Sequence, residues 1–372
     1  MKVLFQSRTT LFSAPGGDTV QLLKTREYLE KMGVEVDIAE ELEPDVSAYD
    51  LVHVFNLMRA QEAWIQVRSA KRQGKPVALS TIYGLYTEYE QKARGGLFGL
   101  IARHSGPYML EYLKIAARCV TSGELHKGAL AVLGQGYYRT LKKIVSRVDV
   151  FLPNSDSEMA RVAREMKLVD PPYVAVPNAV DTEVFDYERV DATELEGYEG
   201  CLVCAARIEG RKSQLNLVRA MKDLPYRLLI IGKPSPNHMA YYEQVKAEAG
   251  DNVEFIGAVD HAELAKYYKV ARASALISWM ETPGLSSLEA AAMRCNLVIT
   301  EKGDTRDYFG DFAAYCEPDD VSSIRNAVIR AMEQPFDEAL RDHVLEHYTW
   351  DKTAQATLKG YEMALAGGKS GQ

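Results

Sequence analysis

The chain has 372 residues, of which 47% are hydrophobic and 26% charged, and these proportions are typical of a soluble globular protein with about two domains. Its formal net charge of −8 argues against general nucleic-acid binding, which depends on Lys and Arg contacts to phosphates. Five scattered cysteines favour a reduced compartment. No apolar run approaches the roughly 18 residues of a membrane span, and the N-terminus lacks a signal-peptide pattern. A cytoplasmic location is therefore expected.

The first forty residues follow a strand–loop–helix–strand pattern. Residues 2–6 and 34–38 are short apolar runs, and residues 19–31 between them carry apolar side chains at helical spacing, which predicts a βαβ unit. The loop before the helix contains Gly16 and Gly17, and because glycine lacks a Cβ these residues allow a ligand to approach the backbone. The dinucleotide and P-loop glycine signatures are both incomplete, so neither NAD nor ATP chemistry is indicated.

The α/β alternation continues through the next hundred residues and predicts a doubly wound parallel sheet. His53 lies inside one apolar run, where a core histidine with satisfied hydrogen bonds is expected rather than a catalytic one. The expected strands are residues 51–55, 77–81 and 148–152, with a helix at 61–73.

The stretch 91–148 is strongly basic. Ten Lys and Arg residues face only two Glu residues, so it carries +8 in a chain of net charge −8, and aromatic and aliphatic residues are interleaved with the charges. One interpretation is two helices with solvated basic faces. The other is a surface for anionic lipid, where each basic residue adds about 1 kcal/mol, or for a polyanionic acceptor. The second interpretation predicts peripheral association with the inner face of the plasma membrane.

The second half of the chain resumes the alternation after an acidic, linker-like run at 186–200. A strand beginning at Leu202 leads into Arg207 and Lys212, at a strand end where doubly wound sheets bind their ligands. A guanidinium that binds bidentately and an ammonium that acts as a point charge together suit a diphosphate. The alternative is that both are exposed basic residues of a loop.

The stretch Glu281-Thr-Pro-Gly-Leu-Ser-Ser-Leu-Glu289 follows an apolar run at 273–279 and leads into an Ala-rich segment that is expected to be helical. Pro283 and Gly284 mark the helix start, where freed backbone amides can hold an anion. These amides are those of Gly284, Leu285 and Ser286. A phosphate at the amides and sugar hydroxyls at the two flanking carboxylates are therefore predicted. The alternative is a solvated helix that carries two glutamates.

Four motifs occur in a fixed order: Gly16-Gly17, Pro177-Asn178 with Asp181, Arg207 with Lys212, and Glu281 with Glu289. In this order they resemble the retaining family 4 glycosyltransferases of the GT-B fold, and the resemblance covers nearly the whole chain. The sequence departs from the family pattern where Ala179 replaces the usual glycine. It also departs after residues 77–81, where Thr81-Ile-Tyr83 stands in place of a histidine. We therefore assign no catalytic histidine, and leave open whether Tyr83 replaces it.

The resemblance implies a role for each residue of the site. Glu289 would hold the donor ribose, Glu281 would face the transferred sugar, and the segment ending at Val259 would line the base. Arg207 and Lys212 would neutralise the leaving diphosphate in place of Mg²⁺, so neither a metal nor a cofactor is expected, and the chain contains no Asp-x-Asp pair. The predicted catalytic residues are Glu281, Arg207 and Lys212, and the predicted donor-binding residues are Gly16, Gly17, Val259, Pro283, Gly284, Leu285, Ser286 and Glu289.

The predicted fold is α/β, with two Rossmann-like doubly wound domains facing a central cleft. Residues 1–180 would bind the acceptor, joined by a C-terminal helix within 350–372, and residues 181–349 would bind the nucleotide sugar. The predicted function is retaining, metal-independent transfer of a sugar from a nucleotide diphosphate sugar to a glycan, a lipid-linked acceptor or a small molecule. The alternatives are a nucleotide-sugar-binding protein of the same fold without turnover, and an epimerase or phosphorylase of that fold.

Overall fold

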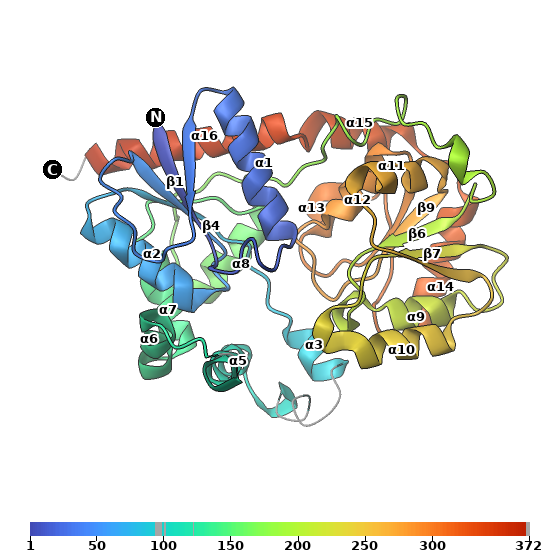
Figure 1. The fold of residues 1–372 in the computed structure, drawn as a ribbon, viewed down its shortest axis with the longest axis horizontal. Helices are drawn as coiled ribbons and strands as arrows, with labels where there is room; N and C mark the ends of the chain where they lie inside the picture. The colour runs from blue at the N-terminus through green and yellow to red at the C-terminus, as the bar shows by residue number, and fades with distance from the viewer. Residues whose placement is uncertain (94–98, 100–101, 122, 370–372) are drawn as a thin grey trace. The chain divides into compact units, whose positions relative to one another are not determined.

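The computed structural model describes the chain except for residues 94–98, 100–101, 122 and 370–372 (Figure 1). The chain divides into two compact units, each built on a parallel sheet, and the predicted α/β class is confirmed. Unit 1 comprises Met1–Leu85, Ile101–Asn178 and Trp350–Gln372, and unit 2 comprises Tyr86–Leu100 and Ala179–Thr349.

The sheet of unit 1 has the strand order β2-β1-β3-β4-β5, and all its pairings are parallel. β3 and β4 are buried along their whole length, which explains why the sequence shows continuous apolar runs there rather than alternation. The run at 148–152 forms only a two-residue strand. The strands are β1 (Lys2–Gln6), β2 (Glu35–Ala39), β3 (Leu51–Phe55), β4 (Val77–Ser80) and β5 (Val150–Phe151).

In the described part of the basic stretch, where two helices were one of the interpretations, unit 1 contains the helices α5, α6 and α7. α5, α6 and α7 pack together, and α2 packs on α6 and α7. Residues 94–98, 100 and 101 of the basic stretch lie outside the described residues. The helices are α1 (Gly17–Lys31), α2 (Ala60–Arg72), α5 (Pro107–Thr121), α6 (Lys127–Gln135), α7 (Tyr137–Val145), α8 (Asp156–Met166) and α16 (Trp350–Lys369).

The C-terminal helix α16 is part of unit 1, where it packs against α1. His53 fixes it to the sheet, because its two ring nitrogens lie 2.7 Å from the Tyr361 hydroxyl and 2.9 Å from the Ser80 hydroxyl. Burial lowers the pKa of His53 to about 3, so the ring is neutral. The expectation of a core histidine is confirmed.

The sheet of unit 2 has the order β11-β10-β9-β6-β7-β8, again with parallel pairings. The apolar run at 273–279 is a strand only over its first four residues, and the remainder leads into the loop that carries Glu281. The strands are β6 (Leu202–Ala205), β7 (Leu228–Ile231), β8 (Val253–Gly257), β9 (Ala273–Leu276), β10 (Asn296–Ile299) and β11 (Ala314–Tyr315).

Two hydrophobic cores cover the faces of this sheet. One contains side chains of α11, α12 and α15, and the other contains side chains of α9, α10 and α14. The helices of unit 2 are α3 (Thr87–Lys92), α9 (Gln214–Ala220), α10 (Met239–Glu248), α11 (His261–Val270), α12 (Leu285–Ala292), α13 (Thr305–Phe309), α14 (Val321–Glu333) and α15 (Glu338–His347). Residues 86–100, which include α3, lie within the range predicted for the first domain, but their contacts place them in unit 2.

Candidate functional site

The predicted residues of the second half meet at the carboxyl ends of β6 and β9, which are neighbouring parallel strands. Lys212 belongs to the loop after β6, and Glu281 belongs to the loop after β9. Their side chains form an ion pair, Lys212 Nζ to Glu281 Oε1, with only 16% and 12% of the side chains exposed. Parallel pairing therefore brings together two residues that lie 69 positions apart in the sequence.

Backbone hydrogen bonds fix the loop of Glu281 from both sides. The Glu281 N–H donates to the Lys302 carbonyl at 3.0 Å, and the Asp304 N–H donates to the Glu281 carbonyl at 2.9 Å. Between them Gly303 has φ +97°, and a Cβ there would lie 2.0 Å from the Glu281 carbonyl oxygen. Only glycine fits this position. No signal in the sequence linked this glycine to Glu281.

The N-terminus of α12 lies beside Glu281, as predicted. Gly284 precedes the helix with φ +85°, and a Cβ there would lie 2.6 Å from Leu276 Cδ2 and 3.6 Å from Glu281 Oε2. The amides of Leu285 and Ser286 open the helix, so they have no carbonyl partner within it. Pro283 is buried just ahead of this turn. The arrangement provides two amide donors close to a carboxylate and an ammonium.

Glu289 lies further along α12 and is only 8% exposed. Among the described residues, none forms a hydrogen bond or ion pair with its carboxylate. Burial, together with the nearby charge of Asp181, raises the pKa of Glu289 to about 8. A buried carboxylate of this kind can accept hydrogen bonds from ligand hydroxyls, which is the chemistry predicted for it.

Arg207 lies in the loop after β6 that also carries Lys212, and its role beside Lys212 stays a prediction. Its side chain is exposed, and its carbonyl accepts a hydrogen bond from Gln214 at 2.9 Å. A different arginine, Arg211, is half-buried in the same loop and donates from Nε to Glu209 at 2.6 Å. Burial alone would raise the pKa of Glu209, but Arg211, Arg207 and Lys212 hold it below its usual value. Three cations thus act on one buried carboxylate, and Arg211, the one in contact with it, was not among the predicted residues.

Val259 follows β8, is partly buried and packs against the core that also contains α12. Gly257, at the end of β8, has φ +88° and turns the chain there. Within β8, Glu254 accepts a hydrogen bond from the Tyr198 hydroxyl at 2.8 Å, and the role of the segment in lining the base stays a prediction.

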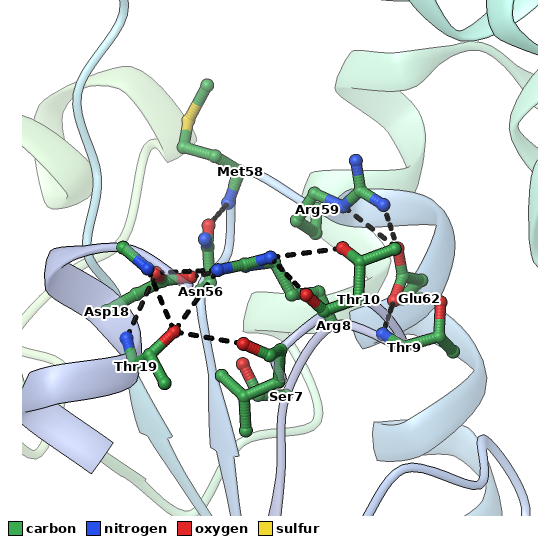
Figure 2. A network of polar contacts seen from close by, with 12 residues as sticks. Ser7, Arg8, Thr9, Thr10, Asp18, Thr19, Asn56, Met58, Arg59 and Glu62 are labelled. Atoms are coloured by element: carbon green, nitrogen blue, oxygen red, sulfur yellow. Dashed lines mark hydrogen bonds and ion pairs between the residues drawn. The ribbon is translucent and has the colours of Figure 1, made fainter. Parts of the chain in front are cut away.

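Gly16 and Gly17 lie in unit 1, where Gly16 caps α1 and Gly17 begins it. A network of polar contacts holds this loop (Figure 2). The Arg8 guanidinium donates to both oxygens of Asp18, at 2.6 and 3.0 Å, and to the Thr10 carbonyl at 2.7 Å. The Gly16 N–H donates to Thr19 Oγ1 at 3.1 Å. The conformation of the glycine loop is therefore set by charged side chains that the sequence did not single out.

The same network anchors the chain just after β1 (Figure 2). The Thr9 N–H donates to Glu62 Oε2 at 2.6 Å, and Arg59 Nε donates to Glu62 Oε1 at 2.8 Å. Glu62 is 1% exposed, so this carboxylate is a buried support rather than a ligand for solvent. The hydrogen bond from Thr9 to Glu62 therefore fixes the backbone of the loop after β1.

Tyr83 is fully buried, and its hydroxyl donates to Glu165 Oε2 at 2.6 Å. The Tyr108 hydroxyl donates to the same oxygen at 2.7 Å. The backbone N–H of Tyr83 is held by the buried Glu158 at 2.6 Å. Tyr83 is thus a packing residue of unit 1 and does not present its hydroxyl in place of a histidine.

Among the described residues, no group of three or more His, Cys, Asp and Glu side chains is arranged to hold a metal ion. None of the helices in that part of the chain combines the length and the apolar character that a membrane crossing demands.

Comparison with known proteins identifies the family. Residues 190–346 match the model of the glycosyl transferases group 1 family. A D-inositol 3-phosphate glycosyltransferase of Nocardioides is 26% identical over an alignment of 407 positions, which covers 94% of this chain and 86% of the relative. These matches support a family-4-like glycosyltransferase.

Solved structures show that this glycosyltransferase has the GT-B fold. Sucrose-phosphate synthase of Thermosynechococcus elongatus superimposes with a TM-score of 0.76 at 17% identity, covering 98% of this chain and 99% of that one. The Anabaena protein HepE in complex with UDP and glucose superimposes with a TM-score of 0.68 at 12% identity, covering 97% and 99%. The glycosyltransferase is also 31% identical to the glycogen synthase of Mycobacterium tuberculosis over 125 residues, 32% of this chain and 30% of that one.

Proposed function

We propose that this glycosyltransferase transfers a sugar from a nucleotide diphosphate sugar with retention and without a metal ion. The observation that carries the proposal is the Lys212–Glu281 pair beside the N-terminus of α12. One ammonium, two amides and one carboxylate are the groups needed to hold a diphosphate next to a sugar. The related HepE structures contain UDP, which supports a nucleotide as the carrier.

In the proposed reaction the bond between the sugar anomeric carbon and the diphosphate oxygen breaks as the acceptor hydroxyl attacks from the same face. The acceptor proton passes to the departing phosphate oxygen, so no covalent enzyme intermediate is needed. Negative charge grows on the diphosphate, and Lys212 with the amides of Leu285 and Ser286 would stabilise it by a few kcal/mol for each donor, as other preorganised sites do (~3 kcal/mol). Glu281 would then face the sugar, and Glu289 would accept the ribose hydroxyls.

Metal independence follows from the same groups, because fixed cations would take the part of Mg²⁺. Lys212, Arg207 and Arg211 all lie close enough to Glu209 to lower its pKa. A bound diphosphate would meet this positive cluster. We expect full turnover in the presence of EDTA, and turnover that needs an added divalent ion would contradict the proposal.

The deciding experiment is a screen of UDP-, GDP-, ADP- and CDP-sugars without metal, with thermal stability and donor hydrolysis as readouts. One donor that raises the melting temperature and is slowly hydrolysed supports the proposal and fixes the sugar. Stabilisation without hydrolysis, both alone and with acceptor-containing membranes, would favour a binding protein without turnover. A failure of every donor to bind would overturn the proposal.

We further propose that the acceptor side of the enzyme docks on anionic membranes through the basic stretch. Four basic side chains of α7 and its end have no carboxylate partner among the described residues: Arg139, Lys142, Lys143 and Arg147. The adjoining helices α5 and α6 and the connection between them expose apolar side chains, with Val120 86%, Leu125 65%, Leu130 56% and Met109 54% exposed. Cations beside exposed apolar groups suit a lipid interface. Co-sedimentation with phosphatidylglycerol vesicles, but not with phosphatidylcholine vesicles, is expected at low salt.

A further inference from the structure

The helix α3 follows β4 in the sequence, yet its contacts belong to unit 2. None of the motifs assigned to the donor site includes it. Tyr86 and Tyr89 of this segment contact the loops that carry Lys212 and Glu281. Glu88 contacts Lys302, in the loop after β10 that hydrogen-bonds to the Glu281 backbone. The segment therefore has a position that the proposed function does not yet explain.

The first contact is made to the loop of Lys212. Arg211 donates from Nη1 to the Tyr86 hydroxyl at 2.6 Å, and its guanidinium carbon lies 4.9 Å from the centre of the Tyr86 ring. The Arg211 carbonyl accepts the N–H of Trp279 at 3.0 Å, so this residue also joins the loop of Lys212 to the loop of Glu281. Tyr86 thus holds the residue next to Lys212 by both a hydrogen bond and ring stacking.

The second contact is made to the loop that supports Glu281. Glu88 Oε1 accepts from Lys302 Nζ at 3.1 Å. The carbonyl of the same Lys302 receives the N–H of Glu281 at 3.0 Å. Lys92 lies 2.8 Å from Glu88 and 3.6 Å from Asp319, which ties the end of α3 to the same unit.

Between these two contacts, the side chain of Tyr89 packs against the loops of Lys212 and Glu281. A Cβ on Gly210 would lie 2.3 Å from the Tyr89 hydroxyl oxygen, so the tyrosine lies directly against the short turn Gly210–Lys212. The Tyr89 ring centre is also 6.2 Å from that of Trp279. A side chain at position 210 would therefore require Tyr89 to move.

We propose that Tyr86 and Glu88 are positioning residues of the donor site. One short helix holds Arg211 with one side chain and Lys302 with another, and so fixes the spacing between the loops of Lys212 and Glu281. Positioning of this kind acts on the rate of the chemical step, because small displacements of catalytic groups reduce it strongly. The inference rests on the proposed function of the Lys212–Glu281 pair.

The test compares Tyr86→Phe and Glu88→Gln with matched controls in unit 2. Tyr226→Phe removes a hydroxyl bonded to Glu333 at 3.3 Å, and Glu194→Gln removes the exposed partner of Lys266. We expect the first pair of variants to lower kcat about three- to tenfold, with the KM for the donor and the melting temperature nearly unchanged, while both controls keep full kcat. Unchanged kcat in Tyr86→Phe and Glu88→Gln, or an equal loss in the controls, overturns the proposal.

A charge swap separates positioning from a general structural role. Glu88→Lys should lower kcat, and the double variant Glu88→Lys with Lys302→Glu should recover part of it, because this ion pair is restored with its direction reversed, while Lys92 and Glu317 each lose a partner. The loss in Glu88→Gln should also shrink at high salt, since the Glu88 side chain is 37% exposed. A double variant no better than the single variant contradicts the assignment.

Hydrogen exchange tests the contact without any substrate, and so distinguishes failure of this inference from failure of the proposed function. In the full-length protein, Arg211→Met and Lys302→Met should each speed exchange in peptides covering residues 86–93, although they lie more than a hundred positions away. If the two variants exchange faster but the natural protein shows no turnover with any donor, the contact is supported and the proposed function is contradicted. If exchange at residues 86–93 is unchanged in both variants, the proposed contact is contradicted, whether or not the protein is active.

Discussion

The ion pair between Lys212 and Glu281 has a consequence for donor binding that can be measured. A diphosphate that binds the Lys212 ammonium must displace the Glu281 carboxylate from it or share it. Replacing Glu281 with Gln keeps an oxygen acceptor of the same size but removes its charge. Since a charged hydrogen bond contributes about 1.5–3 kcal/mol and a neutral one about 1 kcal/mol, the competing interaction should weaken by about 1–2 kcal/mol.

That difference corresponds to about a five- to thirtyfold lower Kd for the nucleoside diphosphate. The same variant should lose most of its sugar transfer, because the carboxylate that faces the sugar is gone. Affinity for the diphosphate and turnover are therefore expected to change in opposite directions. Isothermal titration calorimetry with the nucleoside diphosphate of the preferred donor measures the first, and a single-turnover transfer assay measures the second.

The control is Glu194→Gln, which removes an exposed ion pair with Lys266 in the same unit. Its Kd should equal that of the natural protein. A Glu281→Gln protein that binds the nucleoside diphosphate no more tightly than the natural protein would refute the reasoning. It would show that Glu281 does not compete for the Lys212 ammonium.

The remaining predictions concern three other residues. Lys212→Ala should lower kcat/KM more than tenfold, about 1.5–3 kcal/mol of transition-state binding, and steady-state kinetics with unchanged values would exclude its role. The pKa of Glu289 in the folded protein is about 8, above the ordinary value of 4.5. The free energy of unfolding should therefore fall as the pH rises from 4.5 through 8. Over that range, the melting temperature of Glu289→Gln should rise relative to that of the natural protein. Donor affinity of the natural protein should rise over the same interval if the carboxylate is the binding form, whereas Glu289→Gln should show a flat profile by calorimetry. Gly303→Ala should lower both the melting temperature and kcat, because its Cβ would lie 2.0 Å from the Glu281 carbonyl oxygen, and a variant with unchanged values would disprove that constraint.

Local patterns in the sequence were sufficient for most of the fold. The continuous apolar runs of β3, β4 and β9 indicated strands buried on both faces, and these require a parallel sheet covered by helices on each side. The helix start at Gly284 followed from Pro and Gly preceding an Ala-rich run. These features depend on neighbours within a few residues, so the sequence contains them directly.

The sequence was less informative about how side chains pair at the site. The spacing predicts that Arg207 and Lys212 serve one site, but it gives no sign that Arg211 of the same loop is half-buried against Glu209. Whether a loop residue points inward depends on the turn geometry and on partners from other strands. The spacing of a motif gives no information about the turn geometry or about partners from other strands. Tyr83 is a similar case, because only its burial against Glu165 shows that its hydroxyl is occupied.

What the sequence determined by itself is the order of elements, the family and the residue types that can hold a diphosphate and a sugar. What only the tertiary structure decided is which of those residues meet. Parallel pairing of β6 with β9 joins Lys212 to Glu281, and the fit of Gly303 against the Glu281 backbone fixes that residue. The physical reason is that local propensity acts over a few residues, whereas an ion pair between two loops depends on strand register and on close packing across the whole unit.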